Sequence, residues 1–307
     1  MDVSRVKGFK TMIWATLFCR QSFFALAVIG LFLGCDNSTT SVPKPAAASK
    51  ISVLVTAYPM VEMIKRIGGE QVDVQWLVES GQRPEDIDLG PDLRQRASKA
   101  ALVVTSGPWD TWAVSELNAD ARSARVLEPG RTTAGRQVDP KSYPWLDASV
   151  MLELIEKARI RLTILDPNHE TDYRNNAAAY QTEIQTIDKE IRAGLNKVAA
   201  RQVLAVRPGW GALCKRYGLS LLIPIETTEE KLTPDNLKQI ARLAKANGIK
   251  SIFVDSATSA AVRQQIEEKT GLKTVELDAL GSSADDGRNT WGKVMRFDLE
   301  QLKKGLE

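Results

Sequence analysis

Several polar side chains of this sequence stand where an apolar, strand-like run gives way to a loop and then to a helical pattern. They are Glu85, Asp86, Asp88, Tyr143, Arg207 and Asp278. Carboxylate and phenol oxygens can bind a cation or accept hydrogen bonds, whereas an arginine is a fixed positive charge that binds anions. Ligands of α/β proteins lie outside the carboxyl ends of parallel strands, where these residues are expected. Each residue alone fits a solvated loop or a helix cap, but together they predict a ligand-binding cleft.

The sequence contains no recognisable arrangement of catalytic residues. The single histidine, His169, lies beside Glu170 at the start of a helical pattern, which does not indicate Ser-His-Asp or Cys-His machinery. Neither G-x-x-x-x-G-K-[ST] nor a G-x-G-x-x-G after a strand occurs. The chain has 41 basic and 38 acidic residues, of which four basic and one acidic residue lie in the first 34 positions. The remainder therefore has 37 of each kind and no net charge. We therefore expect a binding protein, not an enzyme, and no nucleic-acid partner.

Strand-like apolar runs alternate with helical patterns in two separate stretches of the chain. In the first stretch strands are expected at 51–56, 72–78, 101–105 and 125–127, and helices near 59–67, 91–98 and 109–117. In the second stretch strands are expected at 202–206, 220–225, 251–255 and 273–277, and helices near 211–217, 234–247, 259–270 and 289–304. This alternation predicts an α/β protein with two (βα)4-type lobes, each built on a parallel sheet.

The segment between the two stretches has no strand pattern. "ASVMLELIEKARIRLTILDP" predicts a helix that ends at Asp166 and Pro167. The helical pattern from there to residue 200, with Asn168 as its N-cap, would form a helix about 45 Å long at 1.5 Å per residue. Its apolar repeat is too irregular for the alternative, a coiled-coil partner helix. We expect one long, rigid backbone helix that joins the lobes.

The beginning of the chain has the pattern of an export signal. "SFFALAVIGLFLG" follows Arg20 and has the length of a signal-peptide apolar region, too short to span a bilayer. It ends in "LFLGC", which resembles a bacterial lipobox with Cys35 as the lipidated residue; an uncleaved N-terminal anchor is the alternative. Residues 36–50 are rich in Ser, Thr, Pro and Ala, as in a flexible tether. Both alternatives place the body outside the cytoplasmic membrane, in the periplasm or at the cell surface.

These patterns divide the chain into five parts. We expect a signal peptide at 1–34, a lipidated tether at 35–50, an N-terminal lobe at 51–145, a helical linker at 146–200 and a C-terminal lobe at 201–307. Cys214 is the cysteine left in the body, so no disulfide framework and no cysteine metal cluster is indicated.

From residue 51 to the C-terminus, the sequence resembles the metal-binding solute receptors of bacterial ABC importers, the zinc and manganese family of the ZnuA/TroA/PsaA type. "PEDIDLGPDL" resembles that family's P-H-D-x-E-P-x-P, and "PWLD" resembles its H-x-W-L-D-P. "WGALCKRYGL" resembles F-G-Y-F-A-R-R-Y-G-L, and "GLKTVELDALG" resembles G-V-K-V-V-V-L-D-P-L-G. The resemblance implies a monomeric receptor that binds a divalent metal ion, Zn or Mn, and that has an ABC permease and an ATPase as partners.

The same resemblance implies that most of the metal ligands are replaced. In the family, three histidines from the first three connections and a carboxylate after the last strand bind the ion. By motif, these positions hold Glu85, Tyr143, Arg207 and Asp278, and Asp88 is a further cleft residue. Arginine has no lone pair to offer a metal, and oxygen donors suit manganese better than zinc.

Two functions remain open at this point. In the first, a metal ion binds in the inter-lobe cleft to Glu85, Tyr143 and Asp278. In the second, a receptor of the same fold has lost its metal, Arg207 forms a salt bridge with Glu85 or Asp278, and the ligand is an organic anion or a partner protein.

The lipobox-like motif predicts that Cys35 becomes the acylated first residue of the mature chain and Asp36 its second. Mass spectrometry of membrane-extracted protein should detect a lipid-modified N-terminal cysteine. Cys35→Ala should shift the protein from the membrane fraction to the soluble fraction. An unmodified wild-type chain cleaved at another residue would contradict this assignment.

Overall fold

The computed structural model describes residues 49–77, 82–84, 91–107, 125–129, 139, 141–223, 232–283 and 287–307. The chain divides into two units, Met1–Ala47 and Ala48–Glu307, and all of these residues belong to the second. Several predicted features lie outside the described part: the signal at 1–34, Cys35, most of the tether, Glu85, Asp86, Asp88 and the helix expected near 109–117.

The first sheet is parallel, with the strand order β2-β1-β3-β4. Its strands are β1 (Ile51–Val55), β2 (Val72–Trp76), β3 (Leu102–Val104) and β4 (Val126–Leu127). Two helices follow strands of this sheet, α1 (Tyr58–Gly68) and α2 (Pro91–Lys99), with a 3-10 turn, η1 (Gly69–Gln71), before β2. The central strand β1 pairs with a strand on each side and has almost no exposed surface, as its apolar sequence requires.

The second sheet consists of two parallel pairs, β5 with β6 and β7 with β8. The strands are β5 (Gln202–Leu204), β6 (Ser220–Leu222), β7 (Ser251–Asp255) and β8 (Lys273–Leu277). A parallel bridge between Ala205 and Phe253 connects the two pairs. The helices are α7 (Gly211–Tyr217), which follows the 3-10 turn η6 (Pro208–Trp210), α8 (Pro234–Asn247), α9 (Ala260–Thr270) and α10 (Trp291–Leu306). Four of these elements, β7, β8, α7 and α8, have the bounds expected from the sequence.

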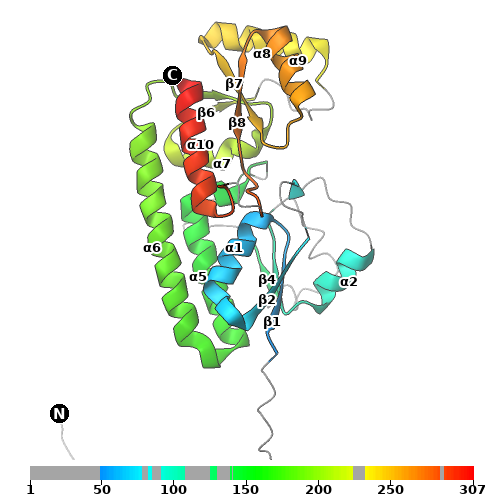
Figure 1. The fold of residues 1–307 in the computed structure, drawn as a ribbon, viewed down its shortest axis with the longest axis vertical. Helices are drawn as coiled ribbons and strands as arrows, with labels where there is room; N and C mark the ends of the chain where they lie inside the picture. Colours follow the sequence, from blue (N-terminus) through cyan, green and yellow to red (C-terminus); the bar gives the residue numbers. More distant parts are fainter. Residues whose placement is uncertain are drawn as a thin grey trace, which may run out of the picture. The chain divides into compact units, whose positions relative to one another are not determined.

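Two long helices occupy the middle of the chain and lie side by side, with α6 along the outer edge of the view (Figure 1). They are α5 (Ala148–Leu165) and α6 (Glu170–Leu195), preceded by the 3-10 turns η4 (Pro144–Leu146) and η5 (Pro167–His169). With 26 residues, α6 is about 39 Å long. The prediction of two α/β lobes with parallel sheets joined by a long helix is therefore confirmed.

The start of α6 differs from the prediction that Asn168 is its N-cap. The helix begins at Glu170, after the turn η5. Asp166 organises this turn, because its Oδ2 lies 2.5 Å from His169 Nδ1 and accepts a hydrogen bond of 2.8 Å from the Tyr173 hydroxyl. His169 is therefore the residue at the N-cap position of α6, and no side-chain hydrogen bond caps the helix there.

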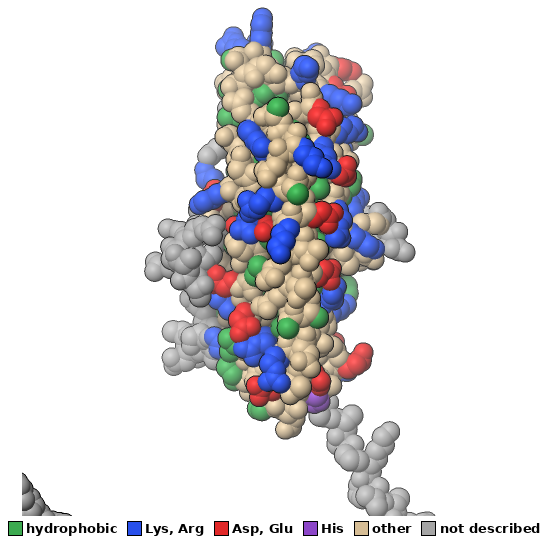
Figure 2. Space-filling model, turned by 90° about the vertical axis from the view of Figure 1, so that its left-hand side faces the viewer, with side chains coloured by type: hydrophobic (Ala, Val, Ile, Leu, Met, Phe, Trp, Pro, Cys, Tyr) green, Lys and Arg blue, Asp and Glu red, His purple; other side chains and the backbone are tan. Residues whose placement is uncertain are grey.

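An apolar stripe along α6 holds the two halves of the protein together. Its members follow the three- and four-residue spacing of one helix face: Tyr173, Ala177, Tyr180, Ile184, Ile187, Ile191 and Leu195. They pack against α1 from the first lobe, α10 from the last and α5 between them. Figure 2 shows that the face on the left of Figure 1 carries interspersed basic and acidic side chains instead. None of the described helices is both long and apolar enough to cross a bilayer.

Ile187 is fully buried in this stripe, so Ile187→Ala should lower the free energy of unfolding by about 2–5 kcal/mol. Denaturant unfolding followed by circular dichroism measures this change. Lys189→Ala is the matched control, because Lys189 lies exposed on the same helix and its loss should change the free energy by less than about 0.5 kcal/mol. Equal losses for the two variants would show that the stripe does not hold the fold together.

Candidate functional site

The carboxyl ends of the second sheet bring three polar residues to one edge. Asp255 is the last residue of β7, Asp278 follows β8, and Arg207 follows β5 at the start of η6. The pairing of Asp255 with Leu277 in neighbouring strands puts Asp255 and Asp278 side by side. This edge carries two of the residues expected from the sequence, Arg207 and Asp278, together with Asp255, which was not expected.

Arg207 faces Asp255. Its Nε lies 3.7 Å from Asp255 Oδ2, and the two side chains are only 12% and 7% exposed. A second arginine, Arg83, reaches the same oxygen from the first lobe, with its Nε at 3.2 Å and a side chain 10% exposed. Arg83, Arg207 and Asp255 thus form a nearly buried cluster that joins the lobes, and we call it the inter-lobe clasp.

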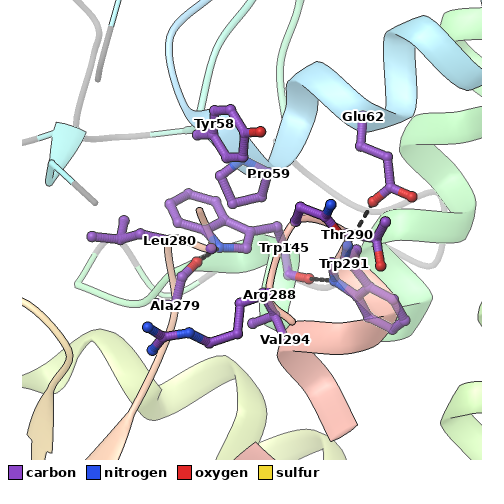
Figure 3. A pocket seen from close by; sticks show the side chains of 12 residues that line it. Tyr58, Pro59, Glu62, Trp145, Ala279, Leu280, Arg288, Thr290, Trp291 and Val294 are labelled. Carbon is purple, nitrogen blue, oxygen red and sulfur yellow. Dashed lines mark hydrogen bonds between the residues drawn. The ribbon is translucent and has the colours of Figure 1, made fainter. Parts of the chain in front are cut away.

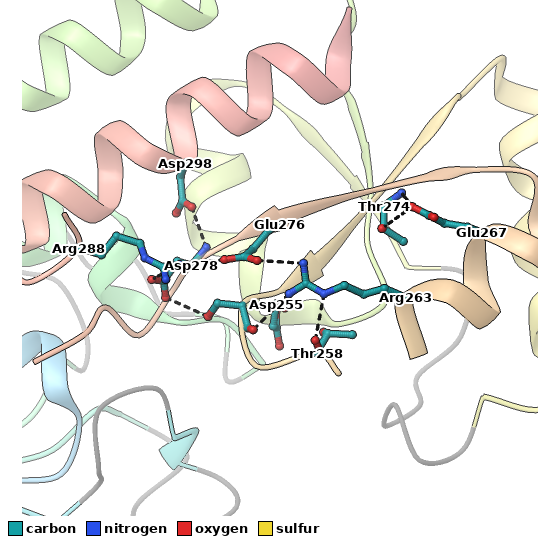
Figure 4. Close-up of polar contacts among 10 residues, drawn as sticks. Asp255, Thr258, Arg263, Glu267, Thr274, Glu276, Asp278, Arg288 and Asp298 are labelled. Carbon is teal, nitrogen blue, oxygen red and sulfur yellow. Dashed lines mark hydrogen bonds and ion pairs between the residues drawn. The ribbon is translucent and has the colours of Figure 1, made fainter. Parts of the chain in front are cut away.

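The expected salt bridge between Arg207 and Asp278 is wrong. Asp278 Oδ2 lies 3.2 Å from Nη1 of Arg288, which comes from the loop before α10 (Figure 4). Asp278 Oδ1 accepts hydrogen bonds from the backbone of Leu280 (2.9 Å) and Gly281 (3.0 Å). The Ser256 hydroxyl donates to the same oxygen at 3.2 Å. Asp278 therefore caps the turn after β8 and has its own cation, which leaves Asp255 for Arg207. The other expected partner of Arg207, Glu85, lies outside the described residues.

Tyr143 lies in an aromatic cluster. It is 2% exposed, stacks on Trp145 with ring centroids 5.0 Å apart, and meets Trp210 edge-on at 6.4 Å. Its backbone N–H donates to the carbonyl of Gly209 at 2.8 Å. Gly209 permits this approach, because a Cβ there would lie 2.5 Å from the Tyr143 ring. The ring of Tyr143 therefore packs between the segment before α5 and the loop that carries Arg207.

Tryptophans form the junction between the lobes beside this cluster (Figure 3). Trp145 Nε1 donates to the carbonyl of Ala279 at 2.6 Å, and Trp291 Nε1 donates to the carbonyl of Trp145 at 2.8 Å. Glu62 on α1 accepts the backbone N–H of Trp291 at 2.6 Å. Burial raises the pKa of Glu62, while this hydrogen bond and Arg66 lower it in part. The pocket here is lined mainly by apolar side chains, which identifies it as a packing junction between α1 and the start of α10.

Asp298 lies fully buried on α10, and its side chain points toward the backbone of Asp278 (Figure 4). Its Oδ1 accepts the backbone N–H of Asp278 at 2.8 Å, and its Oδ2 has no hydrogen-bond partner among the described residues. Burial raises the pKa of Asp298 well above the usual value, and the nearby negative charges of Asp278 and Glu276 raise it further. These surroundings favour a neutral carboxyl group that supports the turn of Asp278.

The described residues do not assemble a metal-ligand set. No group of three His, Cys, Asp or Glu side chains among them could hold an ion. At the positions implied by the resemblance, Tyr143 is packed in the aromatic cluster, Arg207 is a cation and Asp278 is paired with Arg288. These residues do not fit a zinc site, which needs neutral imidazole, thiolate or carboxylate donors around one point. Glu85 and Asp88 lie outside the described residues.

Four polar residues of this region were not anticipated from the sequence: Arg83, Asp255, Arg288 and Asp298. Asp255 could have been found, because it ends "SIFVD" as a polar residue after an apolar run. Asp298 carries a second signal, since it stands on the apolar face of α10 between Met295 and Leu302. Arg83 and Arg288 lie in loops, where an arginine is ordinarily solvated, and their sequence offers no signal.

Comparison with known proteins decides the family. A family model described as zinc-uptake complex component A, periplasmic, matches residues 53–305. The chain belongs to this family. The metal ABC transporter substrate-binding lipoprotein of Lactococcus lactis subsp. lactis (strain IL1403) is 24% identical over 93% of this chain and 96% of its own length. The manganese ABC transporter substrate-binding lipoprotein PsaA of Streptococcus pneumoniae is 24% identical over 93% of this chain and 98% of its own.

A solved structure has the same fold as this chain. The crystal structure of the metal-dependent lipoprotein YcdH from Bacillus subtilis matches with a TM-score of 0.70 and 23% identity, over 84% of this chain and 99% of that one. At family level, these are components of transport systems and not enzymes. The sequence-based recognition of the family is confirmed.

Asp298 provides a test of the electrostatics of this site. The pKa of Asp298 is higher in the folded protein than in the unfolded chain. When the pH rises past the ordinary value near 3.8, the unfolded chain therefore loses this proton while the folded protein keeps it. Stability should therefore fall with rising pH until Asp298 ionises in the folded state. Asp298→Asn keeps the acceptor for the Asp278 N–H but cannot ionise, so it should weaken this dependence.

Denaturant midpoints of the wild type and Asp298→Asn, measured from pH 5 to pH 8, test this prediction. As the pH rises, the denaturant midpoint of the variant should increase relative to that of the wild type. Asp235→Asn, at an exposed position on α8, is the control and should follow the wild type. Parallel profiles for the Asp298 variant and the wild type would contradict the shifted pKa.

Proposed function

We propose that this chain is the extracytoplasmic, lipid-anchored solute-binding component of a zinc/manganese-type ABC importer. As a monomer, it would pass its solute from the inter-lobe cleft to an ABC permease driven by an ATPase. The observation that carries this proposal is the family match over residues 53–305, on a fold of two parallel-sheet lobes joined by α6. The names of the relatives, which describe substrate-binding lipoproteins of metal ABC transporters, support the same role.

In the first candidate for the solute, a divalent metal ion binds to Glu85, Tyr143 and Asp278, with Asp88 and Arg207 beside it. Asp278 supports this candidate, because it stands in the family's carboxylate position. An ion there would compete with Arg288 for Asp278 and would meet the positive charge of Arg207. Since a like charge nearby opposes a cation, we expect much weaker affinity than a histidine-lined cleft would have.

A second candidate rests on the inter-lobe clasp. Arg83 and Arg207 both face the carboxylate of Asp255, so two guanidinium groups from different lobes meet at this place. An arginine fork suits carboxylate groups. In this candidate, the receptor has lost its metal and takes an organic anion or the acidic surface of a partner protein.

Calorimetric titration with Zn²⁺ and Mn²⁺ separates the two candidates. The wild type should bind both ions weakly, and Arg207→His should bind at least tenfold more tightly, because the substitution removes a fixed charge and adds an imidazole donor. Arg242→His is the matched control, since it places the same change at an exposed position of α8. Tight stoichiometric binding by the wild type would overturn the charge argument and establish the metal candidate.

A further inference from the structure

We infer that the inter-lobe clasp determines specificity in the cleft: Asp255 holds Arg83 and Arg207 at the meeting point of the lobes, and these two guanidinium groups select against a free divalent cation. The inference concerns the site to which the proposed function assigns the solute, and in this sense it rests on that function. It assigns a role to a residue outside the four ligand positions implied by the family.

The geometry of the clasp places Asp255 at the meeting point of the two lobes. Asp255 ends β7 in the second sheet, and Arg207 follows β5 of the same sheet. Arg83 comes from the segment between β2 and α2, in the other lobe. The nitrogens Nε of both arginines lie within 3.7 Å of a single oxygen, Asp255 Oδ2. One carboxylate therefore contacts cationic groups from both lobes.

A bound cation in such a cleft would have the opposite arrangement, with donor groups of both lobes gathered around a positive centre. In this chain, the centre is an anion and the converging groups are cations. The three side chains are 7–12% exposed, so solvent and salt screen them much less than surface ion pairs. Removing the carboxylate would take an anion away from two guanidinium groups in a poorly hydrated place, which is unfavourable.

The acidic side chains near Asp255 are also paired with arginines. Arg263 on α9 donates to the backbone carbonyl of Asp255 at 3.1 Å and binds Glu276 at 2.9 Å (Figure 4). Arg288 binds Glu276 at 2.8 Å and lies 3.2 Å from Asp278. Each of these acids thus already faces a guanidinium group. A divalent ion that bound any of these three carboxylates would have to displace at least one arginine.

Hydrogen exchange with mass spectrometry on the full chain, freed of metal by a chelator, tests the closure. Asp255→Asn should raise exchange about tenfold in the peptide that carries Arg83 and in the peptide of residues 204–212, while peptides of α6 remain unchanged. Asp235→Asn makes the same chemical change at an exposed position of the same lobe and should alter neither peptide. Unchanged exchange in both peptides of Asp255→Asn would overturn the inference.

Arg83→Gln gives an independent measure, and it decides the outcome if Asp255→Asn also loosens α6. The clasp predicts increased exchange in the peptide of residues 251–260, which lies in the opposite lobe from Arg83. In the double variant Arg83→Gln/Asp255→Asn, this increase should not exceed that of Asp255→Asn, because both changes break one contact. Additive increases, or none in Arg83→Gln, would show that the lobes are not joined at Asp255.

Calorimetry with Mn²⁺ alone tests the selectivity. The variant Arg83→Gln/Arg207→Gln removes both guanidinium groups from the carboxylate of Asp255 and should bind Mn²⁺ at least tenfold more tightly than the wild type. Asp255→Asn keeps both arginines and should show no gain. Tight binding of Mn²⁺ by the wild type, with no change in exchange at the clasp peptides, would overturn the inference. A different result would show that the proposed function is wrong: a strain without this chain would import metals normally. The exchange data in metal-free solution do not depend on that result.

Discussion

The burial of one face of α6 is the constraint on which the rest of the structure depends. The stripe from Tyr173 to Leu195 has almost no exposed surface, and it packs at once against α1 of the first lobe and α10 of the last. Because apolar burial is the main favourable contribution to folding, neither lobe can leave this helix without exposing the stripe. The strand ends of the second sheet and the segment carrying Arg83 meet on the frame that this packing creates.

The contacts between the lobes divide into two kinds with different physical character. The tryptophan junction combines apolar packing with satisfied hydrogen bonds from Trp145 and Trp291, so it stabilises the contact between the lobes without using a charge. The clasp consists of three charged side chains with little exposed surface, and the cost of removing them from water offsets much of their attraction. A contact of this second kind responds steeply to the loss of one partner or to a competing charge, as a ligand-binding site must.

Family membership and site chemistry point in different directions here. The match covers residues 53–305 and the fold agrees with that of a metal-dependent lipoprotein, yet the described ligand positions hold a packed tyrosine, an arginine and an ion-paired aspartate. A fold can persist while its site changes, because the apolar stripes that specify the lobes do not include the polar residues at the strand ends. In our proposal, the two arginines of the clasp take the place of the positive charge that a metal ion would bring to the cleft.

Much of this architecture was determined by local sequence pattern. Apolar runs and helical periodicity predicted β7, β8, α7 and α8 with their observed bounds, and the strand-free middle predicted the long helix between the lobes. The motif of "GLKTVELDALG" also located Asp278. Such features depend on neighbours along the chain, through spacing, capping and turn residues, and the sequence therefore displays them directly.

Only the tertiary structure decided which charges meet. Arg83 and Asp255 are far apart along the chain, and the choice of Arg288 for Asp278 and Asp255 for Arg207 follows from how helices and sheets pack, which no local pattern records.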